Sequence, residues 1–260
     1  MTERFARERV RHELRRRALS VLRIAEAAPG MVRITLGGAD LEGFDAPGPA
    51  DHVKVFLPAG DGETVMRDYT PRAFRPAAEG GPELDLDFVV HGHQGAPGGP
   101  AAAWASSARP GDGIEIGGPR GSALPPSGVD AAILVADESA LPAAARWIDA
   151  LGDTPVTGLF SVADEGVSAY LAAHEGPGRD FRWFTGADRD ARVAEALRGT
   201  AIGDGTFLFL AGEATALVPM RRYLRRELGL PKGQLDVSGY WKRGTAGLDH
   251  HAPLDPDDED

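Results

Sequence analysis

A β + α/β fold is predicted for this chain, with an N-terminal antiparallel β-barrel domain followed by a doubly wound parallel-sheet domain. Three observations support this prediction. The 260 residues are enough for two ordinary domains. From about Ala18 to Ser122, apolar residues come in short alternating runs between turn residues. After PPSG, buried strands alternate with helical segments instead.

The first half has the period of two that is typical of strands. ALSVLRIAEAAPGMVRITLGG and DHVKVFLP both alternate in this way. In ELDLDFVV the apolar residues fall on one face of a strand, whereas Asp85 and Asp87 fall on the other. This half therefore predicts an antiparallel sheet that closes into a small barrel.

The second half alternates between strand and helix patterns. The segments AAILVA, TPVTGLFSVA, FRWF, TFLFLAG and LDVSGYW are typical of buried strands, and helical patterns lie between most of them. We place the boundary near Ser127, which gives a barrel domain over 1–127, an α/β domain over 128–251, and an acidic disordered tail over 252–260. Ligands of such a sheet bind beyond the carboxyl ends of its strands.

The best-defined helix is expected from about Thr215 to Leu228, before Gly229 and Pro231. Its apolar stripe consists of Leu217, Met220, Leu224 and Leu228. Its basic face consists of Arg221, Arg222, Arg225 and Arg226. These arginines either are solvated or bind the 2′-phosphate of NADPH.

Composition excludes several classes of protein. The net charge of −11 disfavours nonspecific nucleic-acid binding, and no run of about 18 apolar residues exists for membrane insertion. The amino terminus resembles neither a signal peptide nor a transit peptide, so we expect a cytoplasmic protein. Without cysteine there is no disulfide, thiolate metal site or iron–sulfur cluster, so redox chemistry would require an organic cofactor.

The segment MRDYTPR combines two arginines, a tyrosine and a threonine. Arginines can bind a pyrophosphate, an aromatic ring can face a planar cofactor, and a hydroxyl can hydrogen-bond a ring nitrogen. In an extended strand Arg67 and Tyr69 share one face, and Thr70 and Arg72 share the other. An edge strand with solvated arginines is the alternative interpretation.

In their order along the chain, eight motifs resemble those of the siderophore-interacting protein family, whose members are FAD-containing ferric-siderophore reductases of the ferredoxin-reductase superfamily. The motifs are DHVKVFLP, RDYTPR, DFVVHG, GPAAAWA, GDGIEIGGPRGS, ADESALPA, LAGEATAL and SGYWKRG. The resemblance runs from about Val21 to Gly244 and implies that the barrel domain binds FAD and that the α/β domain is of the NAD(P)H-binding type.

The resemblance assigns FAD contacts in the first half. Arg67 would bind the pyrophosphate, Tyr69 would stack on the isoalloxazine, and Thr70 would lie near its redox-active edge. The further expected FAD contacts are His91, Gly99, Pro100, Ala101, Ala102 and Trp104. Many relatives carry serine where this chain has Ala102, so backbone N–H groups would have to bind the phosphate there.

The second half supplies the expected nucleotide contacts. Asp137, Glu138 and Ala140 occupy the first strand-to-helix turn, although Asp137 could equally cap the helix. Gly212 and Glu213 would line the nicotinamide side, although Glu213 could be only an N-terminal helix charge. Trp241, in the final motif, is a further expected cofactor contact.

The expected substrate contacts are four cations, Lys54, Arg120, Lys242 and Arg243, which the family resemblance implies for an anionic ferric siderophore. Hydride would pass from NAD(P)H to FAD, and single electrons would then pass to Fe(III). The metal step requires no acid–base residue, and no His and carboxylate cluster has metal-ligand spacing. A ferredoxin is an alternative donor. Two rival functions are a flavin reductase for another acceptor and a noncatalytic siderophore carrier.

Overall fold

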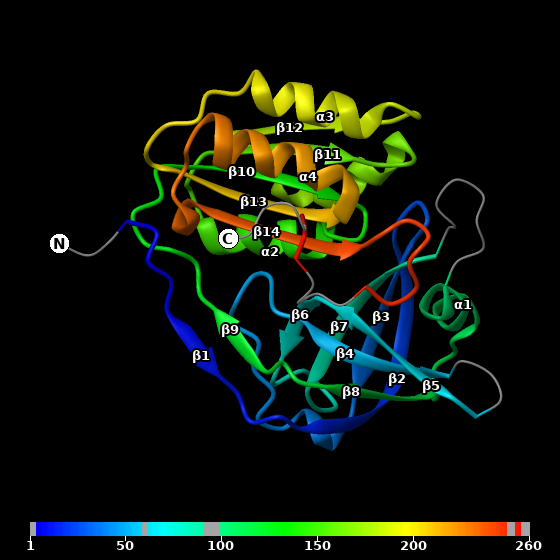
Figure 1. Ribbon diagram of the computed structural model, residues 1–260. Helices are drawn as coiled ribbons and strands as arrows, with labels where there is room; N and C mark the ends of the chain where they lie inside the picture. The colour runs from blue at the N-terminus through cyan, green and yellow to red at the C-terminus, as the bar shows by residue number, and fades with distance from the viewer. Residues whose placement is uncertain (1–3, 59–61, 91–98, 249–252, 256–260) are drawn as a thin grey trace. The chain divides into compact units, whose positions relative to one another are not determined.

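The computed structural model describes residues 4–58, 62–90, 99–248 and 253–255, which form two compact units (Figure 1). The barrel unit is Glu8–Pro125 with Ala145–Trp147. The α/β unit consists of the chain up to Arg7, Pro126–Ala144 and the residues from Ile148 onward.

The barrel unit is built on a seven-stranded antiparallel sheet in the order β5-β4-β8-β2-β3-β7-β6. These strands are β2 (Arg16–Ala28), β3 (Met31–Gly37), β4 (Val53–Pro58), β5 (Thr64–Tyr69), β6 (Pro71–Arg75), β7 (Glu83–Val89) and β8 (Gly113–Gly117). A separate ribbon pairs β1 (Arg9–Arg11) with β9 (Gly121–Ala123), and the helices are η1 (Ala39–Leu41) and α1 (Pro100–Ser107). The prediction of an antiparallel barrel-type unit is confirmed, in the form of a half-barrel.

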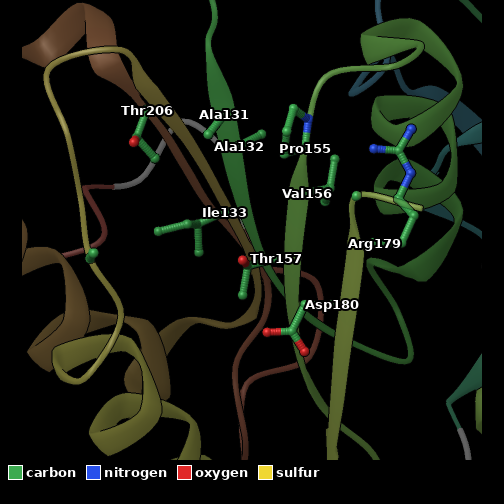
Figure 2. Close-up of a pocket in the computed structure, with 11 residues that line it drawn as sticks. Ala131, Ala132, Ile133, Pro155, Val156, Thr157, Arg179, Asp180 and Thr206 are labelled. Carbon is green, nitrogen blue, oxygen red and sulfur yellow. The ribbon is translucent and has the colours of Figure 1, made fainter. Parts of the chain in front are cut away.

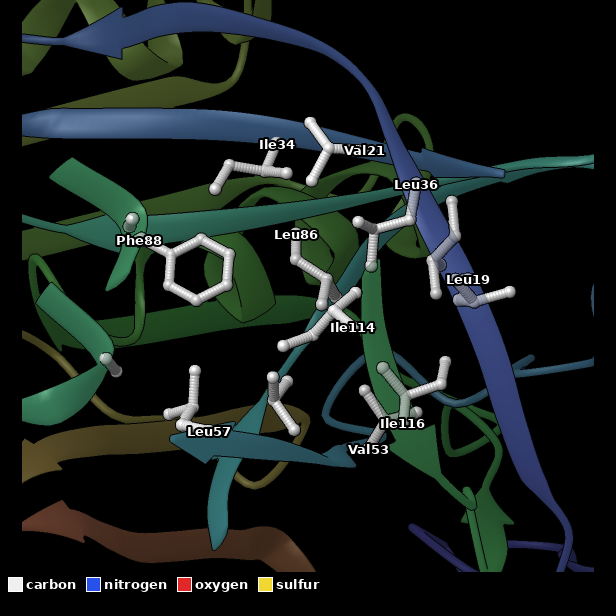
Figure 3. Close-up of a cluster of buried hydrophobic side chains, with 14 of the residues drawn as sticks. Leu19, Val21, Ile34, Leu36, Val53, Leu57, Leu86, Phe88, Ile114 and Ile116 are labelled. Carbon is white, nitrogen blue, oxygen red and sulfur yellow. The ribbon is translucent and has the colours of Figure 1, made fainter. Parts of the chain in front are cut away.

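The alternating pattern of the strands explains the core of this unit. Apolar side chains from β2, β3, β4, β7 and β8 meet in one cluster, including Val21, Ile34, Val55, Leu86 and Ile116, each at most 1% exposed (Figure 3). Removing an aliphatic side chain of this size from water stabilises the fold by about 1.5–3 kcal/mol. The cluster therefore holds the sheet in its curved form.

The opposite face of β7 carries carboxylates that are also buried. Asp85 and Asp87 are each 4% exposed. Arg33 on β3 donates two hydrogen bonds of 2.7 Å to Asp87, and Arg75 on β6 donates two of 2.7 Å to Asp85. The arginines on the neighbouring strands thus pair with Asp85 and Asp87, which allows these carboxylates of β7 to be buried.

The α/β unit has a five-stranded parallel sheet in the order β12-β11-β10-β13-β14. The strands are β10 (Ala131–Asp137), β11 (Val156–Ser161), β12 (Arg179–Phe184), β13 (Thr206–Glu213) and β14 (Leu235–Trp241). Helices α3 (Arg189–Arg198) and α4 (Ala214–Arg222) cover one face, and α2 (Leu141–Leu151) covers the other (Figure 1). The predicted doubly wound arrangement is confirmed. Within the described residues, no helix combines the length and the apolar character that a membrane span requires.

Three details of the helices differ from the prediction or were missed. The 3-10 helix η3 (Glu165–His174) was not predicted. The long helix changes from α4 to the π-helix η4 (Tyr223–Glu227), and the 3-10 helix η5 (Lys232–Gln234) follows. Because the amide of Leu228 donates five residues back, to the carbonyl of Tyr223, the stripe rotates and Leu228 is 43% exposed rather than buried.

Both ends of the described chain pack on the α/β unit. Residues 4–7 group with this unit, where Arg4 pairs with Asp130 and Arg7 donates to Asp236 at 2.6 Å. Residues 253–255, in the segment predicted as an acidic tail, also contact it. Asp255 is 4% exposed and accepts two hydrogen bonds from Arg222.

The buried charges of β7 lead to a stability prediction. Arg33→Ala leaves the fully buried carboxylate of Asp87 without its bidentate partner, so we expect the free energy of unfolding to fall by about 3 kcal/mol. As a control, Arg16→Ala removes a half-exposed pair with Glu115 and should cost about 1 kcal/mol or less. Urea unfolding of both variants measures the difference, and equal losses would contradict the structural role of Arg33.

Candidate functional site

Three aromatic side chains meet at one end of the barrel unit. The ring centroids of Tyr69 and Phe88 are 4.2 Å apart, and those of Phe88 and Trp104 are 5.4 Å apart. Tyr69 ends β5, Phe88 lies on β7, and Trp104 lies on α1. Burial raises the pKa of the Tyr69 hydroxyl above its ordinary value, so the group stays neutral. Phe88 is completely buried, so the partly exposed rings of Tyr69 and Trp104 supply the apolar surface for a planar ring.

Arg67 and Thr70 lie close to Tyr69 in the chain but in different local structure: Arg67 is on β5, and Thr70 follows the end of that strand. Arg67 is half-buried, and its guanidinium donates to the carbonyl of Met66 at 2.8 Å. β5 ends at Tyr69 and β6 begins at Pro71, so Thr70 lies in the break, where it is 6% exposed. Thr70 and Arg72 therefore do not share a strand face, as simple alternation would require.

The amino terminus of α1 has no side-chain cap from its N-cap residue, Gly99, and Pro100 begins the helix. Among the described residues, no atom lies within 4 Å of a Cβ added to Gly99. Ala101 and Ala102 are each 8% exposed and bring no polar side chain to this end. Uncapped N–H groups and small residues suit an anion such as a phosphate. His91, the other expected contact here, lies outside the described residues.

The carboxylate of Asp137 is the centre of the polar contacts at the carboxyl edge of the parallel sheet. Its Oδ1 accepts from the amide of Ser139 at 2.9 Å and from its hydroxyl at 2.5 Å. Its Oδ2 accepts from the amide of Glu213 at 2.9 Å and from Nε1 of Trp241 at 2.7 Å. Burial, and next the negative charge of Glu138, raise the pKa of Asp137 to about 6.

The neighbours of Asp137 in the turn have structural contacts of their own. Glu138 is completely buried and accepts from the amide of Ala163, and Nη1 of Arg189 lies 4.0 Å from its Oε1. Ala140 is the N-cap residue of α2, and its amide donates to the carbonyl of Asp137 at 3.0 Å. This turn therefore uses the Ser139 and Ala140 amides internally, whereas a glycine-rich turn directs such groups at a pyrophosphate.

Glu213 connects the end of β13 to two other segments. It is the N-cap residue of α4, where its Oε2 accepts from the amide of Ala216 at 2.7 Å. Its Oε1 accepts from the amide of Arg243 at 3.0 Å. Asp137 and Glu213 also line a small cavity of about 20 Å³ together with Asp190. The carboxyl edge of this sheet is thus rich in carboxylates.

The four expected substrate cations have different surroundings. Lys54 pairs with Asp68 on the neighbouring strand at 2.9 Å. Arg120 is exposed beyond β8, and Lys242 and Arg243 are exposed beyond β14. Within the barrel unit, Lys54 lies on β4, which pairs with β8, and Arg120 follows β8 in the chain. Within the α/β unit, Lys242 and Arg243 lie in one turn.

The basic face expected on the long helix is largely committed to structure. Asp255 holds Arg222 through two hydrogen bonds, and Arg225 donates to the carbonyl of Leu230. Arg221 is 8% exposed. A 2′-phosphate at this face would have to compete with Asp255 for Arg222.

A groove of about 310 Å³ in the α/β unit lies away from these residues (Figure 2). It is lined by Ile133, Val156, Thr157 and Asp180, from the amino ends of the parallel strands. Its Arg179 donates to the carbonyls of Gly152 and Thr154, at the end of α2. None of the predicted site residues lines it, and α/β sheets bind ligands at the opposite ends of their strands.

Each unit thus brings its own set of predicted residues together. In the barrel unit Tyr69 and Trp104 meet through Phe88, and in the α/β unit Asp137, Glu213 and Trp241 form one hydrogen-bonded group. The alternation in ELDLDFVV predicted Phe88 only as one of the apolar residues on one face of its strand. Its position in DFVVHG, three residues before the expected FAD contact His91, was the available signal.

Comparisons with known proteins agree with this division into units. The family model described as "Siderophore-interacting FAD-binding domain" matches residues 20–64 and 58–123, and the model described as "Siderophore-interacting protein" matches residues 129–244. The chain is 33% identical over 258 residues to the NADPH-dependent ferric-chelate reductase of Escherichia coli, covering 90% of this chain and 96% of that protein. It is 29% identical over 254 residues to the ferric vibriobactin reductase ViuB of Vibrio cholerae, covering 88% and 90%.

Solved structures give the same result. A siderophore utilization protein from T. fusca superposes with a TM-score of 0.80 at 38% identity, covering 95% of this chain and all of that one. The siderophore-interacting protein SipS from Aeromonas hydrophila superposes with a TM-score of 0.73 at 28% identity, covering 89% and 93%. The resemblance seen in the eight sequence motifs is confirmed, and the chain belongs to the siderophore-interacting protein family.

Proposed function

We propose that this protein is a flavin-dependent ferric-siderophore reductase that takes electrons from NAD(P)H. The observation that carries the proposal is the combination, within the barrel unit, of an uncapped start of α1 with the aromatic cluster of Tyr69, Phe88 and Trp104. One suits a phosphate and the other a planar ring, so together they fit FAD. The names of the relatives from Escherichia coli and Vibrio cholerae support iron chelates as the oxidant.

FAD would supply the conversion of a two-electron donor into a one-electron donor, so that one NAD(P)H and two ferric chelates give NAD(P)⁺, one proton and two ferrous chelates. The protein has to bind and align the partners. In the barrel unit, we assign pyrophosphate binding to Arg67 and to the α1 residues Gly99, Pro100, Ala101 and Ala102. Tyr69, Thr70 and Trp104 would contact the ring system, and His91 stays a proposed contact.

We assign the donor site to the carboxyl edge of the parallel sheet, with Asp137, Glu138, Ala140, Gly212, Glu213 and Trp241. Pyridine nucleotides bind at this edge in doubly wound sheets. The Asp137 carboxylate, however, accepts the Ser139 amide and brings a negative charge to the same turn. An ionised Asp137 therefore opposes the pyrophosphate of the donor. A ferredoxin stays an alternative donor.

The oxidant would be a negatively charged chelate. The cations assigned to attract it are Lys54 and Arg120 in the barrel unit and, separately, Lys242 and Arg243 in the α/β unit. The chain as a whole has a net charge of −11, so local cations are needed to attract an anion. No protein group has to donate or accept a proton in the reduction of the metal. Iron is the substrate in this scheme, and the reduced ion is released because hard oxygen ligands hold Fe(II) less tightly than Fe(III).

The first functional prediction concerns the flavin. Arg67→Ala removes a charge-assisted contact to the pyrophosphate and should weaken FAD binding by about tenfold or more, measured by flavin fluorescence titration of apoprotein. Tyr69→Ala should change both affinity and the visible flavin spectrum, whereas Tyr69→Phe, which keeps the ring, should retain the spectrum. Parent-like titrations of Arg67→Ala and Tyr69→Ala would reject these assignments.

The second concerns the donor and pH. Because the pKa of Asp137 is about 6, the carboxyl is mainly neutral at pH 5.5 and ionised at pH 7.5, so KM for NADH should rise between these values. NADH is the suitable probe because it lacks the 2′-phosphate of NADPH, and phosphate monoesters titrate near pH 6. Asp137→Asn should flatten the rise, whereas Asp180→Asn, at the other end of the sheet, should keep it. A parent-like pH profile for Asp137→Asn would exclude Asp137 as its cause.

The third concerns the chelate. Replacing Lys54, Arg120 and Arg243 by Ala should slow reoxidation of prereduced flavin by a ferric siderophore about tenfold or more at low salt. Asp68→Asn, which removes the partner of Lys54, should accelerate it. The effects should shrink at about 0.15 M salt, where the Debye length is about 8 Å. Stopped-flow spectroscopy with a neutral quinone as control oxidant measures this, and an unchanged rate in the triple variant would refute the docking role of these cations.

A further inference from the structure

The cations Lys242 and Arg243 lie on a tight turn directly after β14. The amide of Thr245 donates to the carbonyl of Lys242 at 3.0 Å, and the two residues form an isolated β-bridge. Gly244 has a φ of +76°, a left-handed conformation that favours glycine and lets the chain reverse. We refer to Lys242–Thr245 as the cationic turn. Both of its cations are exposed.

The backbone of the cationic turn is tied to Glu213. The amide of Arg243 donates to Oε1 of Glu213 at 3.0 Å, while Oε2 of the same carboxylate accepts from the amide of Ala216 at 2.7 Å. Glu213 is 8% exposed, so water competes little for these bonds. The carboxylate is therefore fixed by α4 on one side and holds the turn on the other.

The residue before the cationic turn is tied to Asp137. Nε1 of Trp241 donates to Oδ2 of Asp137 at 2.7 Å, and the same oxygen accepts from the amide of Glu213 at 2.9 Å. A Cβ at Gly212 would lie 2.7 Å from the carboxyl carbon of Asp137, and Gly212 has a φ of +141°. Glycine at this position is what allows the carboxylate to approach the end of β13.

A β-bulge directs Trp241 to Asp137. β13 and β14 pair in register up to Gly212 and Gly239, and the next pair is Glu213 with Trp241, so Tyr240 is an extra residue on β14. A bulge changes the face to which the following side chains point. It is therefore Trp241 rather than Tyr240 that stands opposite Glu213.

We propose that Asp137 and Glu213 are positioning residues for the ferric chelate, because they hold the cationic turn through the indole of Trp241 and the amide of Arg243. The inference rests on the proposed role of Lys242 and Arg243 in chelate binding. Neither carboxylate has to touch the chelate. A turn that is already ordered loses less conformational entropy when the anion binds, so this positioning role concerns chelate affinity and is separate from the proposed effect of Asp137 on the donor.

Electrostatics alone predicts the opposite sign for removal of either carboxylate. A negative group near two cations weakens their attraction for an anion, so Glu213→Gln should improve chelate binding if charge is all that matters. Positioning predicts weaker binding instead. Trp241→Phe distinguishes the electrostatic effect from the positioning effect, because it removes the Nε1 donor, keeps an aromatic ring and changes no charge.

The first test measures order in the turn without any ligand. In the apoprotein, hydrogen–deuterium exchange of a peptide that contains Arg243 should become about tenfold faster in Trp241→Phe and in Glu213→Ala than in the parent. Asp180→Asn, which alters a carboxylate at the opposite end of the same sheet, should leave that exchange rate unchanged. Parent-like exchange in both variants would overturn the proposal.

The second test measures turnover with Fe(III) tris(catecholate), a trianionic chelate, at saturating NADPH, and the reoxidation of prereduced flavin by a neutral quinone. Trp241→Phe and Asp137→Asn should raise KM for the chelate by about three- to tenfold, the effect expected when one or two side chains must be ordered on binding. The reoxidation by the quinone, which requires no donor, should stay within about twofold in enzyme of equal flavin content. An unchanged or lower KM for the chelate in Trp241→Phe would overturn the proposal.

Lys242→Ala with Arg243→Ala distinguishes this inference from the function on which it rests. If this double variant keeps the parent KM for the chelate, the cationic turn does not bind the chelate and the proposed substrate site is wrong. If it raises KM while Trp241→Phe and Asp137→Asn do not, the substrate site stands and the positioning role is wrong.

Discussion

The hydrogen bonds of the Asp137 carboxylate are the interactions on which the carboxyl edge of the parallel sheet depends. The carboxylate accepts four hydrogen bonds, from Ser139 in the turn after β10, from Glu213 at the end of β13, and from Trp241 at the end of β14. Burying a carboxylate is costly, and hydrogen bonds offset much of that cost. The raised pKa shows that burial and the charge of Glu138 still outweigh these bonds. One side chain thus connects the ends of three strands, and its burial there makes the carboxyl harder to ionise.

The barrel unit solves a similar problem with arginines. Because strands alternate, the carboxylates of β7 all fall on the face opposite its apolar core residues, and that face is also covered. Arg33 and Arg75, from the strands on either side, form bidentate pairs with Asp87 and Asp85. Phe88 on the other face of the same strand then packs between Tyr69 and Trp104, so a rigid β7 supports the proposed flavin surface.

The proposed function divides the work between the two units in physical terms. The barrel unit offers a helix start without a side-chain cap from its N-cap residue and aromatic rings, which suit a flavin nucleotide. The carboxyl edge of the α/β unit offers carboxylates and a short cationic turn. That edge places a negative charge beside the turn where a pyridine nucleotide is expected. Cofactor binding and donor binding are therefore expected to respond differently to pH.

The sequence alone was sufficient for the fold class, the family and the elements that carry the proposed sites. Period-two alternation in ELDLDFVV and buried runs such as AAILVA follow directly from strand geometry, and the eight motifs identify the family. Patterns of this kind are local, so they can be read without knowing what packs against them. For the same reason, the assignment of FAD to the first half needed only the order of the motifs.

Only the tertiary structure decided the contacts between residues that are distant in the chain. Asp137 lies 104 positions from Trp241, and no local pattern shows that its carboxylate accepts from that indole rather than capping α2. The π-helix that exposes Leu228 and the hydrogen bonds that Arg222 donates to Asp255 likewise depend on long-range packing. Strand and helix periods determine which face a residue occupies, but the partner on that face is determined by how the elements assemble.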